Sequence, residues 1–380
     1  MNLVKIHSIF IIIVMLTFIS CKDNENASVD DEYPIEVEAH IDSYYTSNNH
    51  ASRGVKLTAS SLQSFGVYSF YNGAARVRDA TFTKSGTSWS ANKAMTWAAG
   101  AMDFYAISPS FRITSTAANR TMLSTPKNFA YEVPTNVANQ IDIMFANTIG
   151  LSRGDNNGKI NFAFAPAMHY INFTAKNSIG TDYKVIIETI IVHNIVSNGQ
   201  FEYSSTKSNT GDWVLATDKK YVNDTIVLAS PIELKSTNTA LMNNEYMIII
   251  PQKTTMWRSS KTNPKPIANA DADHNYYVET KAQIIKIDGA NQTYLLGNYD
   301  NSDPVHPQYE SVYFPLAAKT FRKGAGSTLT IDFNGGYNDQ GLPYLENTDR
   351  GEGVEVEVSE WMDFDFEIEE WIPIYEDLIF

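Results

Sequence analysis

Hydrophobic and polar residues alternate strictly over residues 35–42, where every second residue is apolar and the others are acidic residues or histidine. Successive side chains of a β-strand point to opposite faces, so this pattern predicts a half-buried strand. The apolar row of that strand consists of Ile35, Val37, Ala39 and Ile41.

Short apolar segments of the same type recur along the rest of the chain, and Gly, Asn and Pro separate them. The 21 Tyr and 19 Phe suit pleated, half-buried surfaces, and long segments with helical periodicity are missing. This rhythm predicts an all-β protein built of antiparallel sandwiches. The expected strands include residues 65–70, 102–107, 141–146, 160–175, 184–196, 276–287, 313–316 and 328–333.

A cluster of turn-forming residues at 152–158 lies between two apolar runs and predicts a domain boundary. We therefore expect an N-terminal sandwich at 54–157 and a C-terminal sandwich at 158–353. Each is long enough to bury a core of its own.

The first residues of the chain have the pattern of a secretory signal. An apolar run at 9–18 follows Lys5 and is too short to span a bilayer as a helix. Ser20 precedes Cys21, the only cysteine of the chain, as in a bacterial lipobox. Residues 1–20 are thus predicted to be a lipoprotein signal peptide, with acyl chains such as palmitate on Cys21. The alternative is an ordinary signal peptide with a coincidental cysteine.

The residues after Cys21 are polar and acidic, which favours an outer-membrane anchor exposed at the cell surface. The net charge of −14 makes nucleic acid an improbable partner. From Glu346 onward thirteen acidic residues face one basic residue, so this tail carries −12 of that charge. The tail alternates again, at 354–358 and 364–369, which predicts either a strand with an apolar face or a solvated edge strand.

Candidate chemistry is sparse. The sequence contains no nucleophile motif, no phosphate-binding glycine loop and no pair of histidines at a metal-ligand spacing. His169 is interpreted as a packed strand residue, and Asp155 begins a turn rather than a calcium loop. Loops at 271–274 and 300–306 remain weaker candidates for holding a cation. The sequence therefore predicts no enzyme activity, no cofactor and no metal.

The order of several motifs resembles the fimbrillin family, the lipoprotein subunits of type V pili. Pro166 departs from that pattern, because the family usually has His there, and the tail after Trp361 is longer and more acidic. The motifs that carry the resemblance are residues 64–68, 97–109, 142–146, 164–173, 313–316 and 329–337.

The resemblance implies two tandem transthyretin-like antiparallel β-sandwiches and assembly by strand exchange. A trypsin-like, Arg-specific protease would cut between Arg53 and Gly54 and remove the propeptide 21–53 with its first strand. The alternative is that Arg53 is an ordinary loop residue and the strand stays. The acidic segment 354–380 would then be the donor strand for a neighbouring subunit. Its candidate residues are Val354, Val356, Val358, Phe364, Phe366 and Ile368.

The predicted function is thus a stalk, tip or anchor subunit of a cell-surface fimbria that supports adhesion. Its expected partners are other copies or related pilus subunits, the outer-membrane lipid through Cys21, and a host or bacterial surface receptor. The alternative is a non-polymerising surface lipoprotein that binds glycans through exposed aromatic residues.

Overall fold

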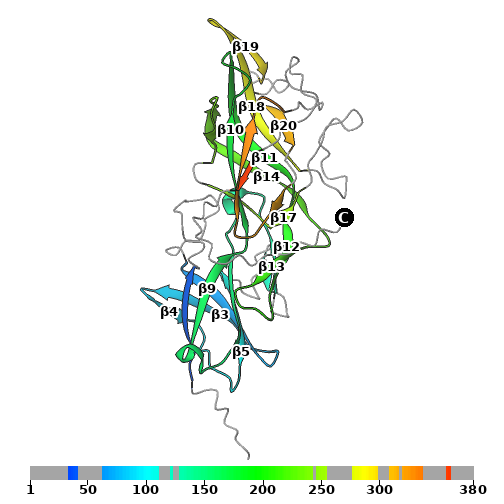
Figure 1. Cartoon of the computed structure of the whole chain (residues 1–380). Coiled ribbons are helices and arrows are strands. Elements are labelled where there is room, and N and C mark those ends of the chain that lie inside the picture. The colour runs from blue at the N-terminus through cyan, green and yellow to red at the C-terminus, as the bar shows by residue number, and fades with distance from the viewer. Residues whose placement is uncertain are drawn as a thin grey trace, which may run out of the picture.

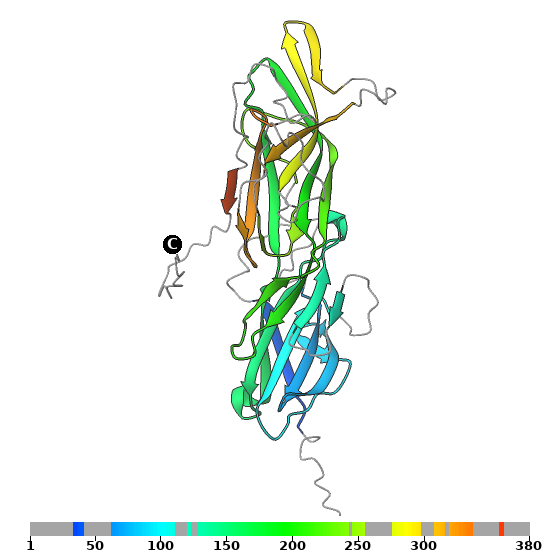
Figure 2. The same cartoon turned by 90° about the vertical axis from the view of Figure 1, so that its right-hand side faces the viewer.

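The computed structural model describes residues 33–41, 62–110, 120–122, 128–242, 245–254, 276–297, 308–315, 319–336 and 357–360, with the backbone alone at 120–122, 315 and 357–360. Its regular elements are β-strands and short 3-10 turns. Figures 1 and 2 show an elongated molecule in which two β-rich parts are stacked end to end. The all-β sandwich class predicted from the sequence is confirmed.

The N-terminal part contains a seven-stranded sheet, with β1 and β4 as its first and last strands among the described residues. All of its neighbouring strands run antiparallel except the first pair, β1 and β9, which run parallel. In sheet order its strands are β1 (Glu36–Ile41), β9 (Lys159–Pro166), β8 (Met144–Leu151), β5 (Met102–Ser108), β2 (Ser64–Tyr71), β3 (Ala74–Ser85) and β4 (Ser88–Ala91).

The β2–β3 hairpin depends on the dipeptide Asn72-Gly73. Both residues have positive φ, 50° and 76°. A tight two-residue hairpin turn needs this left-handed conformation at both positions, and Asn and Gly adopt it at least cost. The local sequence thus determines where the chain reverses and fixes the pairing of Tyr71 with Ala74.

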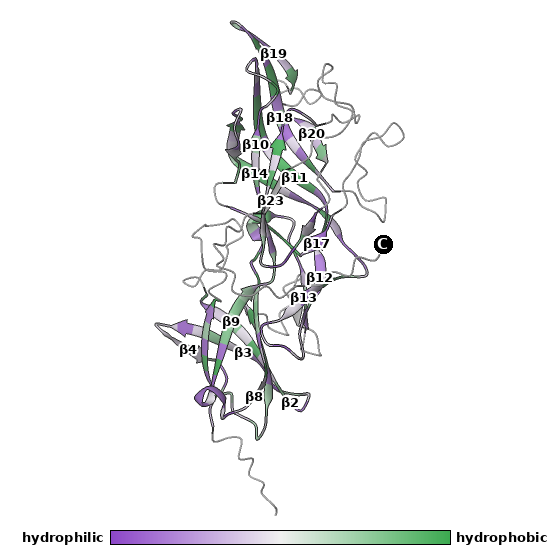
Figure 3. Ribbon diagram, viewed as in Figure 1, coloured by the Kyte–Doolittle hydropathy of each residue, from purple (hydrophilic) through white to green (hydrophobic). Residues whose placement is uncertain are grey.

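Both faces of the central strands β2, β5 and β8 are covered, which explains why most of their residues are buried. On β5, Phe104 and Ala106 belong to one core cluster, while Tyr105 and Ile107 belong to another. In Figure 3 β9 is coloured mainly green, the colour of hydrophobic residues. Its Ile160, Phe162 and Phe164 lie in the same cluster as Phe104.

A four-stranded sheet packs on the second face. Phe129 of β7 and Phe201 of β12 share a core cluster with Tyr105 and Phe145 of the seven-stranded sheet. The rings of Phe145 and Phe201 lie 4.6 Å apart. The strands of this sheet are β13 (Gly211–Leu215), β12 (Asn198–Tyr203), β7 (Asn128–Glu132) and β6 (Arg120–Met122).

The chain crosses the boundary expected at 157/158. Strand β9 follows that position but pairs with β8 in the N-terminal sheet. Strands β12 and β13 also lie beyond it and join the N-terminal part through β7. The turn-forming residues at 155–158 form a 3-10 turn, η4 (Asp155–Gly158), that connects β8 with β9. A turn cluster of this kind looks the same inside a hairpin as between domains.

The C-terminal part is a sandwich of two five-stranded sheets. Ile171, Phe173 and Leu329 from one sheet pack against Ile190 and Val278 from the other. The first sheet contains β15 (Thr239–Ala240), β10 (His169–Lys176), β22 (Gly326–Asp332) and β23 (Glu357–Glu360), with β16 (Met247–Ile249) beside β10. The second contains β14 (Tyr221–Glu233), β11 (Tyr183–Val196), β18 (Tyr277–Asp288) and β19 (Asn291–Leu296), with β20 (Glu310–Pro315) beside β18.

Two strand pairs depart from the expected antiparallel arrangement, because β10 runs parallel to β22 as β1 does to β9. Each pair joins segments that are far apart in the chain, and parallel neighbours require such long connections. The remaining elements are the pair β17 (Gln252–Lys253) and β21 (Thr320–Phe321), and the 3-10 turn η3 (Val137–Asn139).

Candidate functional site

The N-terminal strand β1 is inserted at the edge of the seven-stranded sheet, and Figure 1 shows it in dark blue beside β9. Ile35, Val37 and Ile41 are buried, with 9%, 9% and 4% of their surface exposed. Ala39 is partly buried and packs against the same core cluster. The structure thus places the four alternating apolar residues in one row that faces the N-terminal core.

The backbone of β1 is held along one side and at one end. A parallel ladder with β9 runs from Glu36 opposite Lys159 to Ile41 opposite Phe164. Just before the strand, the amide N–H of Ile35 donates to the carbonyl of Met95 at 2.8 Å. The residues just before β1 are therefore hydrogen-bonded to the segment around Met95, while β1 itself is hydrogen-bonded to β9.

The other side of β1 faces β4 across an open groove. The two strands are the first and last of the same sheet, so the sheet curls until its edges approach each other. No ladder joins these two edges within the described part of the chain. The groove has a volume of about 610 Å³ and is lined by β1, by Trp89 and neighbouring residues of β4, and by Phe82, Lys159 and Asn161. Within the described residues, each of the two strands beside this groove is paired in a ladder on one side only.

Lys159, the first residue of β9, links β1 to its neighbour electrostatically. Its Nζ lies 3.1 Å from Oε1 of Glu38 and 3.4 Å from Oε2 of Glu36. Hydrogen bonds and charges of Glu38 and then Glu36 raise the pKa of Lys159. All three side chains are largely exposed, so the pairs contribute orientation more than stability.

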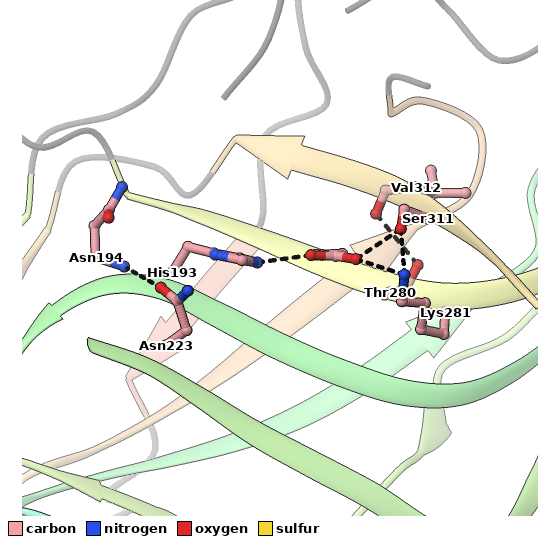
Figure 4. A network of polar contacts seen from close by, with 8 residues as sticks. His193, Asn194, Asn223, Thr280, Lys281, Ser311 and Val312 are labelled. Carbon is pink, nitrogen blue, oxygen red and sulfur yellow. Dashed lines mark hydrogen bonds and ion pairs between the residues drawn. The ribbon is translucent and has the colours of Figure 1, made fainter. Parts of the chain in front are cut away.

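A separate polar network lies on the C-terminal sandwich (Figure 4). The carboxylate of Glu279 accepts hydrogen bonds from His193 Nε2 at 2.8 Å and from Ser311 Oγ at 2.6 Å. Lys281 Nζ lies 3.0 Å from the same carboxylate. The ring of His193 stacks on Tyr277, with ring centres 4.2 Å apart. Residues from β11, β18 and β20 thus meet at one buried carboxylate.

Burial by itself raises the pKa of Glu279, but the hydrogen bonds from His193, Ser311 and Lys281 and the charge of Lys281 outweigh it and lower the pKa to about 2. Glu279 therefore remains ionised and is a very weak base. The hydroxyl of Ser311 donates to this carboxylate and is not activated as a nucleophile by it. The arrangement is that of a structural ion cluster rather than a catalytic one.

The junction between the two parts contains a second buried acid. Asp224 of β14 is 1% exposed, and its Oδ2 accepts a hydrogen bond from Gln140 Nε2 at 3.3 Å. Gln140 Nε2 also donates to the carbonyl of Pro134, and its Oε1 accepts from the amide of Ile248. Burial raises the pKa of Asp224 to about 8, and the bond from Gln140 opposes this only partly.

Most other predicted site residues lie outside the described residues. Val358 is described at the level of the backbone: it belongs to β23 and pairs with Leu329 of β22 (Figure 2). The structure therefore places this part of the expected donor segment on the edge of its own C-terminal sandwich. Outside the described residues lie Cys21, Arg53, Gly54, Val354, Val356, Phe364, Phe366 and Ile368.

The interpretations of single polar residues can be checked directly. His169 is buried, with Nδ1 2.8 Å from the carbonyl of Arg322 and Nε2 3.1 Å from Ser327 Oγ, as expected of a packed residue. Asp155 accepts a hydrogen bond from the amide of Ser152 within a turn. Across the described ranges no group of His, Cys, Asp or Glu has the arrangement of a metal site. Nor does the described part of the chain form a helix that is long and apolar enough to cross a membrane.

The sequence pattern did not predict the network of polar contacts around Glu279. Tyr277, Glu279 and Lys281 alternate with Val278 and Thr280, so they share one face of β18. This pattern resembles a solvated face and gives no sign that Glu279 is 7% exposed. The partners His193 and Ser311 come from other strands, and only the fold brings them together.

The chain matches one family model and is similar to several solved structures. The model of a family described as fimbrillin-like matches residues 47–361. A fimbrial protein from Bacteroides vulgatus is similar in structure, with 16% identity, a TM-score of 0.54 and coverage of 87% of this chain and 99% of that one. The tip fimbrial protein Mfa3 from Porphyromonas gingivalis, with a C-terminal truncation, matches at 10% identity and a TM-score of 0.39, covering 87% and 99% of the two chains. No curated protein sequence matches the chain.

Proposed function

Because the chain belongs to the fimbrillin-like family, we propose that it is a structural subunit of a cell-surface fimbria that assembles by strand exchange and supports adhesion. Family membership supports the general part of this role: a fimbrial, cell-surface protein that associates with other pilus subunits. The family is one of fimbrial proteins and not of enzymes. The observation that carries the strand-exchange proposal is the position of β1 at a sheet edge.

A strand with a buried apolar row and one ladder can be replaced without rebuilding the domain. Ile35, Val37 and Ile41 belong to the core cluster, yet β1 is the terminal strand of its sheet. Burial of a large aliphatic side chain contributes about 1.5–3 kcal/mol, so this row contributes on the order of 5 kcal/mol. Its loss would leave an apolar slot beside β9, and an extended segment from another subunit would restore both the row and the ladder.

The release of β1 requires a cut after it. Arg53 and Gly54 follow β1 in a polar stretch, and we propose their bond as the site for a trypsin-like, Arg-specific protease. Before the cut, acyl chains on Cys21 would anchor the precursor to the outer membrane. One chain binds a membrane only marginally and two bind it durably, so removing residues 21–53 would convert an anchored protein into a free subunit.

The donor is proposed to be the C-terminal segment 354–380. Backbone pairing of β23 with β22 supports an extended conformation for residues 357–360. Strand β23 lies at the end of its sheet, so it can leave without breaking a ladder on a second side. Head-to-tail contacts of this kind make open filaments rather than closed rings.

The test uses purified precursor carrying Cys21→Ser, treated with an Arg-specific protease. We expect a new N-terminus at Gly54 and a ladder of assemblies in size-exclusion chromatography and native gels. The matched control Arg53→Ala should keep residues 33–41 and stay monomeric. A fully cleaved protein that remains monomeric contradicts the proposal, and polysaccharide binding by that monomer would support the glycan-binding alternative.

Deleting residues 354–380 separates the possible positions in the fimbria. A stalk subunit without this segment should no longer polymerise, because it has a groove but no donor. A tip subunit without it should still be incorporated, because only its groove is used.

A further inference from the structure

We propose that Lys159 selects the incoming strand by pairing with Glu355 and Glu357 of a second copy, so that the segment Val354–Val358 takes the register that Ile35–Ala39 has in the precursor. This inference rests on the proposed strand exchange. It adds which residues of the two subunits recognise each other and in what register.

The ion pairs of β1 define what Lys159 recognises. Glu36 and Glu38 are two residues apart, so both side chains lie on the solvent side of the strand while Val37 points to the core. The ammonium group of Lys159 reaches both carboxylates, at 3.4 and 3.1 Å. Lys159 therefore binds two carboxylates that point outward on either side of one apolar residue that points inward.

Removal of β1 leaves Lys159 without these partners. Among the described groove-lining residues outside β1, Lys159 alone is charged; the others are Phe82, Thr87, Ser88, Trp89, Ala91 and Asn161. A second cation lies against a groove-lining residue, since Lys84 Nζ is 5.7 Å from the centre of the Trp89 ring. The emptied groove thus favours a strand with apolar residues inward and carboxylates outward.

The chain contains such a strand in its C-terminal segment. Residues 354–358 read Val-Glu-Val-Glu-Val, and residues 35–39 read Ile-Glu-Val-Glu-Ala. The apolar and acidic positions coincide one by one. The pattern is the same from either end, so Glu355 and Glu357 reach the position of Glu36 and Glu38 whether the donor runs parallel or antiparallel to β9.

A second acidic alternation, at residues 364–368, fits the groove less well. It reads Phe-Asp-Phe-Glu-Ile and would place one aromatic ring at the position of Val37 and the other at that of Ile35 or Ala39, according to the direction of the strand. Overfilling a packed core forces side chains out of their preferred rotamers and destabilises the packing. Volume therefore favours residues 354–358, although both segments carry the right charges.

The same ion pairs prevent premature assembly. While β1 is in place, Glu36 and Glu38 occupy Lys159 and present carboxylates to the groove between β1 and β4. The acidic tail of another copy is repelled by this edge. Lys159 becomes free to pair with the donor strand only when β1 leaves, so cleavage has to precede binding of the donor.

Charge reversal in the full-length precursor tests the inference, with assembly timed after complete cleavage. Lys159→Glu replaces two attractive charge pairs with repulsive ones, so it should slow assembly roughly tenfold at low salt, with a smaller effect in about 0.5 M NaCl. The triple variant Lys159→Glu/Glu355→Lys/Glu357→Lys should recover most of the rate. Wild-type speed in Lys159→Glu, or no recovery in the triple variant, would overturn the inference.

Two matched controls separate the pairing of Lys159 with Glu355 and Glu357 from a general effect of the net charge. Glu369→Lys/Glu370→Lys makes the same charge change in the tail outside the proposed segment and should leave Lys159→Glu slow. Glu36→Gln/Glu38→Gln removes the partners of Lys159 only on the strand that leaves, so assembly after cleavage should keep its rate. If wild-type protein does not assemble at all after cleavage, the proposed function fails, and not only this inference.

Cross-linking gives a readout that does not depend on rates. The cleaved chain contains no cysteine, because Cys21 leaves with the propeptide. Under mild oxidation, Lys159→Cys combined with Glu355→Cys or Glu357→Cys should give disulfide-linked subunits. Lys159→Cys with Glu367→Cys is the control, and cross-linking there instead would identify residues 364–368 as the occupant and refute the assignment.

Discussion

Arg153 lies across the aromatic face of Tyr33, with its guanidinium carbon 3.1 Å from the centre of the ring. Tyr33 comes just before β1 and Arg153 shortly before β9, so the contact ties together the starts of two paired strands. Trp97 holds the same region, because its amide donates to the carbonyl of Tyr33 and its indole Nε1 donates to that of Gly158. The start of the N-terminal strand is therefore fixed by more than its ladder.

Replacing Arg153 with Ala should loosen β1. A cation–π contact contributes about 0.5–2 kcal/mol, so we expect the free energy of unfolding to fall by about 1 kcal/mol. Hydrogen exchange at residues 36–41 should become faster in the same variant. Arg78→Ala, at an exposed position of β3, is the control. Unchanged exchange in β1 would show that Arg153 does not restrain the strand.

Replacing Val37 with Asp should expel β1 from the sheet. Val37 is buried among apolar residues, and an unpaired buried carboxylate costs several kcal/mol unless the strand leaves. We expect the precursor to become sensitive to proteases within residues 33–41 while the C-terminal sandwich remains resistant. His40→Asp puts the same residue on the exposed side of β1 and should leave resistance unchanged. Equal resistance of both variants would contradict the inward orientation of the row.

Glu279 should stabilise the fold down to acidic pH. Its folded pKa of about 2 lies below the ordinary value of 4.5, so its contribution is present above pH 4.5 and is lost as the pH falls from there toward 2. Glu279→Gln should lower the free energy of unfolding by about 2 kcal/mol at pH 7. Urea titrations of wild type and variant should converge as the pH approaches 2. The exposed Glu202→Gln is the control, and a difference independent of pH would argue against an ionised Glu279.

Asp224 has the opposite dependence on pH. Its folded pKa of about 8 lies above the ordinary 3.8, so the folded protein binds one more proton between these values. Stability therefore falls as the pH rises from 4 to 8. Asp224→Asn keeps the acceptor for Gln140 and removes the titration, so the variant should be more stable by about 2–4 kcal/mol at pH 8 and similar to wild type near pH 4.

Thermal melts across that pH range measure the difference. Asp218→Asn makes the same substitution at an exposed position and should behave like wild type. If Asp224→Asn is less stable than wild type at pH 8, the buried carboxyl is ionised and compensated, contrary to the expectation.

The alternation at residues 35–42 was enough to predict a strand and the side chains that it buries. An alternation of apolar and polar residues can be recognised without knowing which strands lie beside it. Ile35, Val37 and Ile41 are buried as the pattern indicates. Likewise, Asn72-Gly73 specifies its turn locally, because the φ angles that the hairpin needs are those that these residues tolerate.

Other features required the fold. The turn cluster at 152–158 suggested a boundary between domains, yet β8 and β9 on its two sides pair in one sheet. Strand β12 packs on the N-terminal part although it directly follows the C-terminal strands β10 and β11, and a single apolar strand does not encode which partner it will cover.

Residue order alone is enough to specify which segments are strands, which of their faces are apolar and where the chain turns, because these depend on residues within a few positions of one another. The tertiary structure decided the parallel pairing of β1 with β9, the approach of β1 to β4 and the meeting of His193, Glu279 and Ser311. These relationships join residues as far apart in the chain as Glu36 and Lys159. The shared burial of whole sheets, and not any local preference, brings them together.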